Sequence, residues 1–487
     1  MTLFSLHNTD QGQAKYLQLA DAIRSAIRKG QLVAGDVLPS VNALSRDLAL
    51  NRHTVMKSLA ELIAEGWIES KQRVGYKVVE HLPIEGSRLS KPSVNNVATP
   101  IQYRIVRPTT PLTDDGCNEY TYHFSGGRPD VALFPFAEFK SHMSDVLSRP
   151  PIHQLGYGET AGNPELIAEV TRYLRKARGI TDREVMITNG SQEAIYMVAQ
   201  LLLQAGDKVA VEALGYPPAM LAFKNAGAQL VSIQQDGQGI VPQDLENKIG
   251  QGDIRLIYLT PLHQYPTTVT LTISRRLQIY QLAAKHQIPI IEDDYDHEYH
   301  YRCQPLAPMA SDDPRQLVIY ISTFSKIMFP GTRIGFIAVS KSMAKVIKEY
   351  RCLLNHKSNV FMQAALARWM KEGGFERHLR RTTRINQQRR DHAVSFLRSL
   401  GVFEFEIPGG GMALWLKIKN HGISTQELAE KAKRDGIYIQ YEGQFRHQNN
   451  SERRRNKNRY IRIGFAGMDE KQFVKGIKAL VVCMNEP

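Results

Sequence analysis

Polar side chains that could do chemistry follow two apolar, strand-like runs in this 487-residue chain. Asp293 and Tyr295 come directly after the run IPIIE, and Ser325 and Lys326 come just after the run LVIYIST. Arg333 lies seven residues beyond the lysine. An amine, a carboxylate, a phenol and a guanidinium at neighbouring strand ends are suited to holding and activating one small ligand.

These two runs belong to a longer series of strand-like segments. VMIT, KVAVEA, RLIYLT, IPIIED and LVIYIST each end in a polar or glycine-bearing turn, and a helical pattern follows. Strands that alternate with helices predict an α/β fold with a mostly parallel sheet, and such sheets bind ligands at the carboxyl ends of their strands.

The turn after VMIT carries Ser191 and Gln192, and the helical pattern AIYMVAQLLL follows them. The first amide groups of a helix are free and lie at the positive end of its dipole. We therefore expect Ser191 and Gln192 to help bind a phosphate.

Together these features predict a site for pyridoxal 5'-phosphate. A lysine such as Lys326 can form a Schiff base with the aldehyde of this cofactor. A carboxylate such as Asp293 can keep the ring nitrogen protonated, so that the ring accepts electrons. Arg333 supplies a forked donor for the phosphate.

A metal centre is the alternative interpretation of the acidic stretch around Asp293. Glu292, Asp293, Asp294, Asp296 and Glu298 lie near His297 and His300. The sequence HEYH does not have the HExxH spacing of a zinc helix, so we predict no metal site.

The N-terminal segment has a different pattern. The apolar spacing of residues 13–29 predicts a first helix that ends at Gly30. Ser40 is suited to cap a second helix, and we expect a third helix to begin near Arg52. Two short helices joined by LALN are typical of a helix-turn-helix, whose second helix enters the DNA major groove.

The third helix divides into an apolar side and a basic start. Its predicted apolar side is Val55, Leu59, Leu62 and Ile63. Two alternating runs around Gly75 predict a hairpin wing with Lys71 and Arg73 near its tip. The residues predicted to contact DNA are Arg46, Arg52, His53, Thr54, Lys57 and Arg73. The alternative is a three-helix packing module whose basic side chains are merely solvated.

Composition limits the class of protein. The 62 Lys and Arg against 48 Asp and Glu give a net charge of +14, which favours polyanionic partners. Apolar stretches are too short for a membrane span. The four cysteines form no CxxC pair, which fits a reducing cytoplasm. Five prolines in residues 81–119 predict an extended linker between residues 11–80 and residues 120–485.

The N-terminal segment resembles a known family nearly end to end. The stretch from QAKYLQLADAIRSAIRKGQ through LPSVNALSRDLALNRHTVMKSLAELIAEGWIES to VGYKV is similar to the winged helix of GntR-type regulators. The resemblance implies that the third helix lies in the major groove of promoter DNA. Asn42 stands where that family usually has a basic residue, and Gly75 alone remains of its double glycine in the wing.

Residues 120–485 resemble a fold-type I aminotransferase domain. The motifs are FSGGRPDVALFP, HQLGYGETAGNPELIAEVTRYLRKARGI, ITNGSQEAI, LTPLHQYPTTVT, IIEDDYDHEY, STFSKIMFPGTRIGF, PGGGMALWL and YIRIGFAG. Joined to the winged helix, the whole chain resembles the MocR subfamily of GntR regulators. This resemblance implies a homodimer.

The resemblance also implies roles for individual residues. Lys326 would bind the cofactor covalently, Asp293 would meet the pyridine nitrogen, and Tyr295 would bond the ring hydroxyl. Tyr216 would stack on the ring, and Arg462 would bind the carboxylate of an effector. The residues implied around the phosphate are Ser191, Gln192, Thr323, Ser325 and Arg333.

Three positions depart from the aminotransferase pattern. Tyr265 replaces an asparagine before a proline, Thr268 replaces a glycine, and Leu214 replaces a proline. The first change is frequent in MocR-type chains and favours a regulator over an efficient enzyme. The basic tract 442–459 is expected to be a solvated loop, with contact to DNA or to an effector phosphate as the alternative.

We therefore expect a cytoplasmic transcriptional regulator that binds double-stranded promoter DNA and senses an amino compound or pyridoxal phosphate itself. Two alternatives stay open. One is an active aminotransferase with a DNA-binding appendage, and the other is a DNA-binding scaffold with a vestigial cofactor site.

Overall fold

A computed structural model describes residues 14–72, 74–82, 120–301, 306–419, 422–446 and 459–485. Arg73, residues 83–119 of the predicted linker and residues 447–458 of the basic tract lie outside the described residues. Contacts divide the chain into two compact units, residues 1–105 and residues 106–487. Among the described residues, no helix combines the length and apolar character needed to cross a membrane.

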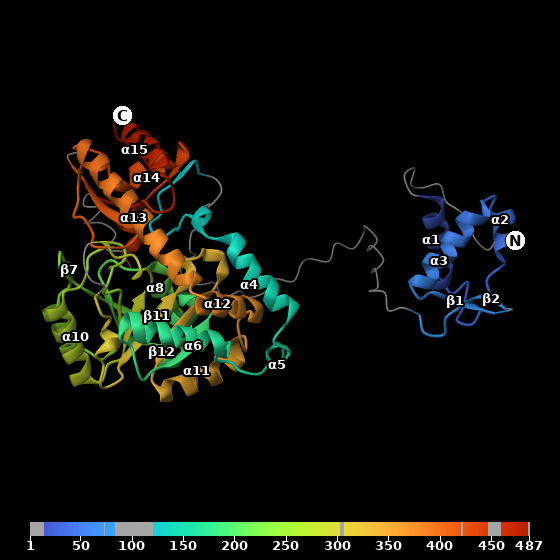
Figure 1. The fold of residues 1–487 in the computed structure, drawn as a ribbon, viewed down its shortest axis with the longest axis horizontal. Coiled ribbons are helices and arrows are strands. Elements are labelled where there is room, and N and C mark those ends of the chain that lie inside the picture. Colours follow the sequence, from blue (N-terminus) through green and yellow to red (C-terminus); the bar gives the residue numbers. More distant parts are fainter. Residues whose placement is uncertain are drawn as a thin grey trace. The chain divides into compact units, whose positions relative to one another are not determined.

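The N-terminal unit has three helices and a hairpin (Figure 1). Its elements are α1 (Lys15–Arg28), α2 (Val41–Asp47), α3 (Arg52–Ala64), β1 (Ile68–Lys71) and β2 (Gly75–Val78). The strands are antiparallel, with Lys71 opposite Gly75. The predicted cap at Ser40 is present, because its side chain accepts a hydrogen bond from the amide of Ala43.

The core of this unit corrects one prediction. Val55, Leu59 and Leu62 are buried as expected, but Ile63 is 38% exposed. Ser58 takes an interior position instead, where its hydroxyl donates to the carbonyl of Tyr16. The buried face of α3 therefore includes Ser58 in place of Ile63, and the hydrogen bond of its hydroxyl satisfies the buried serine.

A seven-stranded sheet forms the centre of the large unit, in the order β4-β12-β11-β10-β9-β5-β6. Its strands are β4 (Glu184–Thr188), β5 (Lys208–Glu212), β6 (Gln229–Ile233), β9 (Ile254–Leu259), β10 (Ile290–Asp294), β11 (Val318–Thr323) and β12 (Gly335–Val339). β12 is antiparallel to both of its neighbours, and the other pairs are parallel. The predicted mostly parallel sheet is confirmed.

Helices cover both faces of this sheet (Figure 1). Successive strand residues face separate cores, as Ile290 and Ile291 do. The helices are α4 (Phe136–Ser148), α5 (Ile152–Leu155), α6 (Pro164–Tyr173) with the π-helix η2 (Leu174–Arg178), α7 (Ser191–Leu202), α8 (Pro217–Asn225), α9 (Pro242–Gly250), α10 (Ile273–His286), α11 (Lys341–Leu354) and α12 (Val360–Lys371). Short 3-10 turns are η1 (Val131–Leu133), η3 (Met309–Ser311), η4 (Phe324–Lys326), η5 (Pro330–Thr332) and η6 (Glu442–Phe445).

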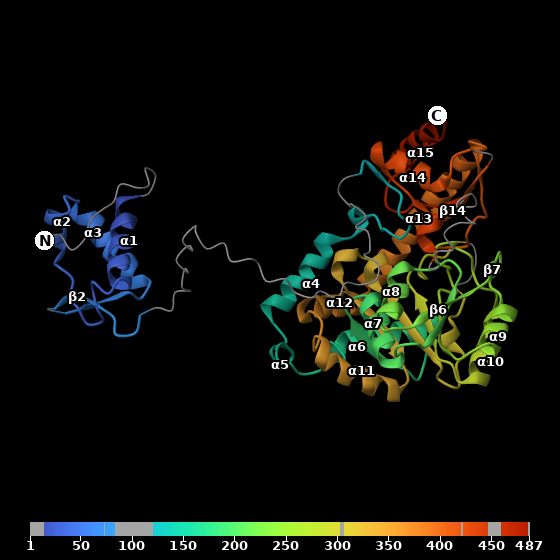
Figure 2. The same ribbon diagram turned by 180° about the vertical axis from the view of Figure 1, so that it is seen from behind.

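A second, smaller sheet follows in the C-terminal part of the chain, in the order β13-β14-β17-β16. The elements here are α13 (Gly374–Ser399), β13 (Phe403–Glu404), β14 (Ala413–Ile418), α14 (Thr425–Arg434), β15 (Ile437–Tyr438), β16 (Gln440–Tyr441), β17 (Tyr460–Gly464) and α15 (Glu470–Asn485). Figure 2 shows α14 and α15 together at the end of this unit that carries the C-terminus. Two further pairs are β3 (Tyr122–His123) with β15, and β7 (Gln235–Asp236) with β8 (Gly239–Ile240).

Candidate functional site

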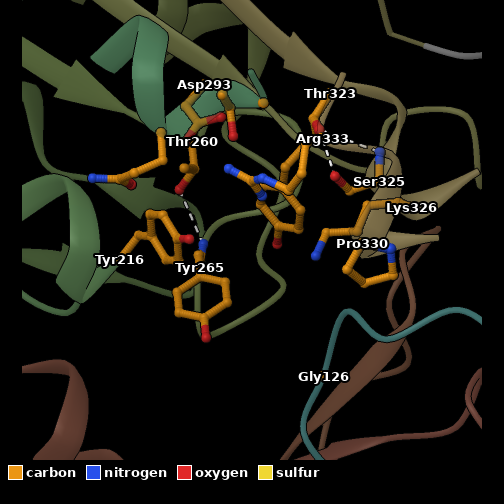
Figure 3. Close-up of a pocket in the computed structure, with 14 residues that line it drawn as sticks. Gly126, Tyr216, Thr260, Tyr265, Asp293, Thr323, Ser325, Lys326, Pro330 and Arg333 are labelled. Atoms are coloured by element: carbon orange, nitrogen blue, oxygen red, sulfur yellow. Dashed lines mark hydrogen bonds between the residues drawn. The ribbon is translucent and has the colours of Figure 1, made fainter. Parts of the chain in front are cut away.

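A cavity of about 140 Å³ lies at the carboxyl ends of the central strands (Figure 3). All nine residues that the sequence predicts around the cofactor line it. The complete lining is Gly126, Gly190, Ser191, Gln192, Tyr216, Thr260, Tyr265, Asp293, Tyr295, Thr323, Ser325, Lys326, Pro330 and Arg333. The topology thus brings together residues that are more than 200 positions apart in sequence.

One end of the cavity is suited to an anion. Gly190 precedes the first turn of α7 with a φ of 82°, and no side chain caps that helix. Gly335 packs so closely that a Cβ there would lie 2.8 Å from the amide nitrogen of Ser191. Arg333 donates from Nη2 to the carbonyl of Asn189 at 2.8 Å. Free helix amides beside a guanidinium are a favourable environment for a phosphate.

Two hydroxyl groups complete this end. Thr323 ends β11, and its Oγ1 lies 3.0 Å from Oγ of Ser325. The backbone amide of Ser325 also donates to Oγ1 of Thr323 at 3.2 Å. This bonding orients both hydroxyls, while both side chains still line the cavity.

Asp293 is a buried carboxylate with one oxygen unpartnered. Its Oδ2 accepts a hydrogen bond from the hydroxyl of Tyr258 at 2.7 Å, whereas its Oδ1 has no hydrogen-bond partner. Burial raises the pKa of Asp293 to about 7, although Tyr258 acts in the opposite direction. A protonated ring nitrogen in the cavity would supply the missing donor and the missing positive charge.

Lys326 ends η4, directly after β11, and its Nζ donates to the carbonyl of Gly127 at 2.8 Å. Gly127 has a φ of 110°, and a Cβ there would lie 3.2 Å from Nζ. Burial lowers the pKa of Lys326. A lower pKa increases the neutral amine fraction, which is the form that attacks a carbonyl.

Tyr265 forms the aromatic side of the cavity. Its ring centroid lies 5.3 Å from that of Tyr216 and 5.9 Å from that of Tyr295, and both contacts are edge-on. The guanidinium of Arg462 lies over the Tyr265 ring, 4.3 Å from its centroid. The hydroxyl of Tyr295 donates to the carbonyl of His263 at 2.9 Å.

Arg462 does not line the cavity, but it lies directly beside it. It is 1% exposed, and its Nη1 donates to the carbonyl of Pro266 at 2.8 Å. Its Nε has no hydrogen-bond partner. Gly126 packs so closely against this guanidinium that a Cβ at that position would clash with Nε.

The acidic stretch around Asp293 is divided among separate partners. Asp294 accepts from Nη2 of Arg178 at 2.6 Å and from the hydroxyl of Tyr320 at 2.6 Å. Burial opposes its ionisation, but His297 and Arg178 hold the pKa of Asp294 well below its usual range. Glu292 accepts from two backbone amides of η3. No group of three or more potential metal ligands occurs among the residues that the structure describes.

Sequence reasoning missed several lining residues. Thr260 comes directly after strand β9 and lines the cavity, so its position at a strand end could have identified it from the sequence. Gly126 and Pro330 carry no such signal, because only the tertiary packing brings them to the cavity. Gln192 lines the cavity as expected, but its Nε2 donates to the carbonyl of Pro218 at 2.9 Å.

In the N-terminal unit, the predicted DNA-contacting residues at the start of α3 are mostly exposed. Arg52, His53 and Lys57 are exposed, whereas Thr54 is half-buried. The Lys57 ammonium lies over the ring of Tyr16, 4.0 Å from its centroid. On α2, the Arg46 side chain is 81% exposed. Arg46, Arg52, His53 and Lys57 are therefore accessible from solvent, and Arg46 pairs with Asp47 at 3.4 Å.

Comparison with known proteins agrees with the division of the chain into an N-terminal unit and a large unit. Residues 134–480 match the family described as "Aminotransferase class I and II", and residues 15–78 match "Bacterial regulatory proteins, gntR family". The chain is 31% identical over 415 residues to "Probable rhizopine catabolism regulatory protein MocR" of Rhizobium meliloti, with 85% of this chain and 80% of that protein covered.

Two further matches extend the comparison. "HTH-type transcriptional regulator TauR" of Rhodobacter capsulatus is 26% identical, with 90% of each chain covered. The crystal structure of kynurenine aminotransferase from Pyrococcus horikoshii, in complex with PMP, has a TM-score of 0.69 and 27% identity. That match covers 76% of this chain and 92% of the enzyme.

The fold and the cavity define an aminotransferase-type domain of class I and II, joined in one chain to a GntR-type DNA-binding domain. The chain belongs to the MocR subfamily of GntR regulators, as its motifs predicted. It is a transcriptional regulator with an aminotransferase-like domain.

Proposed function

We propose that the aminotransferase-like domain binds pyridoxal 5'-phosphate in the cavity and senses an amino compound or the cofactor itself. The unpartnered Oδ1 of Asp293 is the observation that carries this proposal. A cationic partner would stabilise the charged form of this buried carboxyl, whose pKa is raised, and the pyridinium nitrogen of this cofactor is such a partner. When bound, the cofactor supplies an aldehyde for an amine and a ring that withdraws electrons.

The chain's own residues then have separate tasks. Lys326 supplies the amine that binds the cofactor covalently, and Tyr216 packs against its ring. Tyr295 lines the same cavity, and we assign to it the hydrogen bond with the hydroxyl group on the cofactor ring. The proposed phosphate ligands are Ser191, Gln192, Thr323, Ser325 and Arg333, which line the anion end.

Arg462 is the proposed binding residue for a carboxylate on the effector. Two observations support it: the side chain is buried beside the cavity, and its Nε lacks a partner. An effector with both an amine and a carboxylate could therefore meet Lys326 and Arg462 together. Such a ligand regulates only if it binds one arrangement of the protein more tightly than another.

The N-terminal unit is the proposed reader of double-stranded promoter DNA. Its α3 would enter the major groove, with Arg52, His53, Thr54 and Lys57 at the start of the helix and Arg46 on α2. Arg73 is assigned to the wing and lies outside the described residues. A cytoplasmic location follows from this function and fits Cys352 and Cys483, which are not joined in a disulfide.

A homodimer is proposed for the large unit. Large apolar side chains are exposed on α5 and α11 and close to them: Leu353 is 86% exposed, Tyr157 80% and Ile152 74%. The ring of Tyr157 lies 5.1 Å from that of His356, so the segment after α5 meets the segment after α11. Exposed apolar side chains that gather in one patch mark protein interaction sites.

The test is a titration of the full chain against the DNA beside its gene, with and without pyridoxal phosphate and a panel of amino acids. We expect wild-type affinity to change at least about fivefold with one ligand, and the Lys326→Ala variant to show no such change. Arg462→Ala should abolish only responses to carboxylate-bearing effectors.

Two results would contradict the proposal. DNA affinity that is indifferent to every ligand would indicate a vestigial cofactor site. Sustained keto-acid production that depends on Lys326, without any change in DNA binding, would indicate an enzyme instead of a sensor.

A further inference from the structure

His263 and Asp296 form a buried pair that the proposed cofactor contacts do not use. Nδ1 of His263 lies 2.7 Å from Oδ1 of Asp296, and the two side chains are 4% and 3% exposed. A carboxylate only accepts hydrogen bonds, so the imidazole donates from Nδ1. Burying such a pair costs free energy, which only good hydrogen-bond geometry and close packing offset.

The pair is linked to the backbone of Lys326 through Tyr299. His263 follows β9, and its carbonyl accepts the hydroxyl of Tyr295. Asp296 follows β10 and starts a turn in which the amide of Tyr299 donates to its carbonyl. The hydroxyl of Tyr299 then donates to the carbonyl of Lys326 at 3.0 Å.

Two glycines permit a third segment to cover the pair. A Cβ at Gly410 would lie 2.6 Å from Nε2 of His263, and a Cβ at Gly411 would lie 3.2 Å from Oδ2 of Asp296. The same segment continues into β14, which pairs with β17 and places Trp415 opposite Arg462. The segment that covers the pair therefore leads into the strand that pairs with β17, which carries the proposed effector-binding arginine.

The charges that face Lys326 come from several elements. Asp296 and Asp293 favour its ammonium form, whereas Arg462 and Arg128 oppose it. Among these charges Asp296 has the largest effect, ahead of Asp293. Around the pair itself, the ring of His300 lies 5.4 Å from that of His263. Burial and His263 lower the pKa of His300 to about 3, so His300 adds no charge at neutral pH.

We propose that His263 and Asp296 are a positioning pair that sets the proton affinity of the Lys326 amine. Asp296 supplies the buried counter-charge, and the hydrogen bond from His263 holds that carboxylate toward the lysine. Asp293 is then left for the ligand in the cavity. This inference deepens the proposed function and rests on it, because it assigns to Lys326 the role of the reactive amine.

The first test measures Lys326 in the full-length protein without cofactor. The rate of its reductive methylation against pH, followed by mass spectrometry, gives the pKa of the amine. We expect Asp296→Asn to lower this pKa by about one unit, which is a tenfold loss of proton affinity. His263→Phe should lower it as well, and His263→Asn, which keeps a donor near the Nδ1 position, should restore it.

A matched control lies two residues along the same turn. Glu298 is also buried, but it faces Tyr173 and His297. Glu298→Gln should leave the titration of Lys326 unchanged. A role limited to folding would make the variants of Glu298 and Asp296 behave alike, and that result would overturn the inference.

The second test separates this inference from the proposed function. The pH at which uptake of pyridoxal phosphate is half-maximal should fall in Asp296→Asn by the same amount as the pKa of the amine. Failure of the wild-type protein to take up the cofactor would refute the proposed function. Uptake by the wild type, together with an unshifted titration in Asp296→Asn and in His263→Phe, would refute the positioning pair alone.

Discussion

Replacing Asp293 with asparagine should stabilise the cofactor-free protein while weakening its affinity for pyridoxal phosphate. The carboxylate is buried, and burial raises its pKa from 3.8 to about 7. Each pH unit of such a shift corresponds to about 1.4 kcal/mol. The ionised group therefore costs the folded state at most about 4 kcal/mol above pH 7.

The pH dependence follows from the direction of the shift. Between pH 3.8 and about 7 the folded state binds more protons at Asp293 than the unfolded state does. The free energy of unfolding therefore falls as the pH rises through this window. Asparagine has the same shape and still accepts a hydrogen bond from Tyr258, but it carries no charge. The gain in the free energy of unfolding over the wild type should therefore be greatest near pH 8 and about half as large near pH 5.5.

Urea unfolding of the cofactor-free full chain at pH 5.5 and pH 8 measures this effect. Glu212→Gln is a matched control, because burial also raises the pKa of Glu212 to about 7 but the residue does not line the cavity. Both variants should gain stability at pH 8. Only Asp293→Asn should lose affinity for the cofactor, by about 10- to 150-fold, since it removes a hydrogen bond to a charged group.

Either of two results would refute this reasoning. Lower stability of Asp293→Asn at pH 8 would show that the carboxylate already has a favourable partner in the cofactor-free protein. Equal losses of cofactor affinity in Asp293→Asn and Glu212→Gln would show that the effect is not specific to the cavity.

Two smaller predictions concern local backbone structure. Ser40→Ala removes the cap of α2 and should destabilise that helix by about 1 kcal/mol, which faster hydrogen exchange of α2 peptides would show. Asn42→Ala, at an exposed position of the same helix, is the control. Equal exchange in both variants would contradict the assignment of the cap. Thr268 has a φ of 63°, which disfavours a β-branched residue. Thr268→Gly should raise the free energy of unfolding by about 1 kcal/mol, and a loss of stability in urea would show that the threonine side chain contributes more than its strain costs.

Much of the fold could be predicted from local patterns. The five strand-like runs became β4, β5, β9, β10 and β11, because short apolar runs between turn signals correspond to buried strands. β12 was not predicted. It is antiparallel and lies between β4 and β11, and sequence patterns do not report strand order.

The candidate site was predictable to the extent that it depends on strand ends. Asp293 lies at the carboxyl end of β10, and Ser191 and Lys326 come shortly after β4 and β11. The carboxyl ends of these strands direct all three positions to one edge of the sheet. Arg462 was assigned through family resemblance, since its place in the middle of β17 carries no local signal. The exposure of Ile63 was predicted wrongly, because helical spacing alone does not decide which border residue packs inward.

The sequence by itself determined which chemical groups the chain has and which strand ends carry them, because secondary structure and caps depend on neighbouring residues. Only the tertiary structure decided which groups lack partners. The free Oδ1 of Asp293, the stacking of Arg462 on Tyr265 and the pairing of His263 with Asp296 all join distant segments. The electrostatics of this regulator's site therefore arise from packing, since burial and contact set the cost of every charge there.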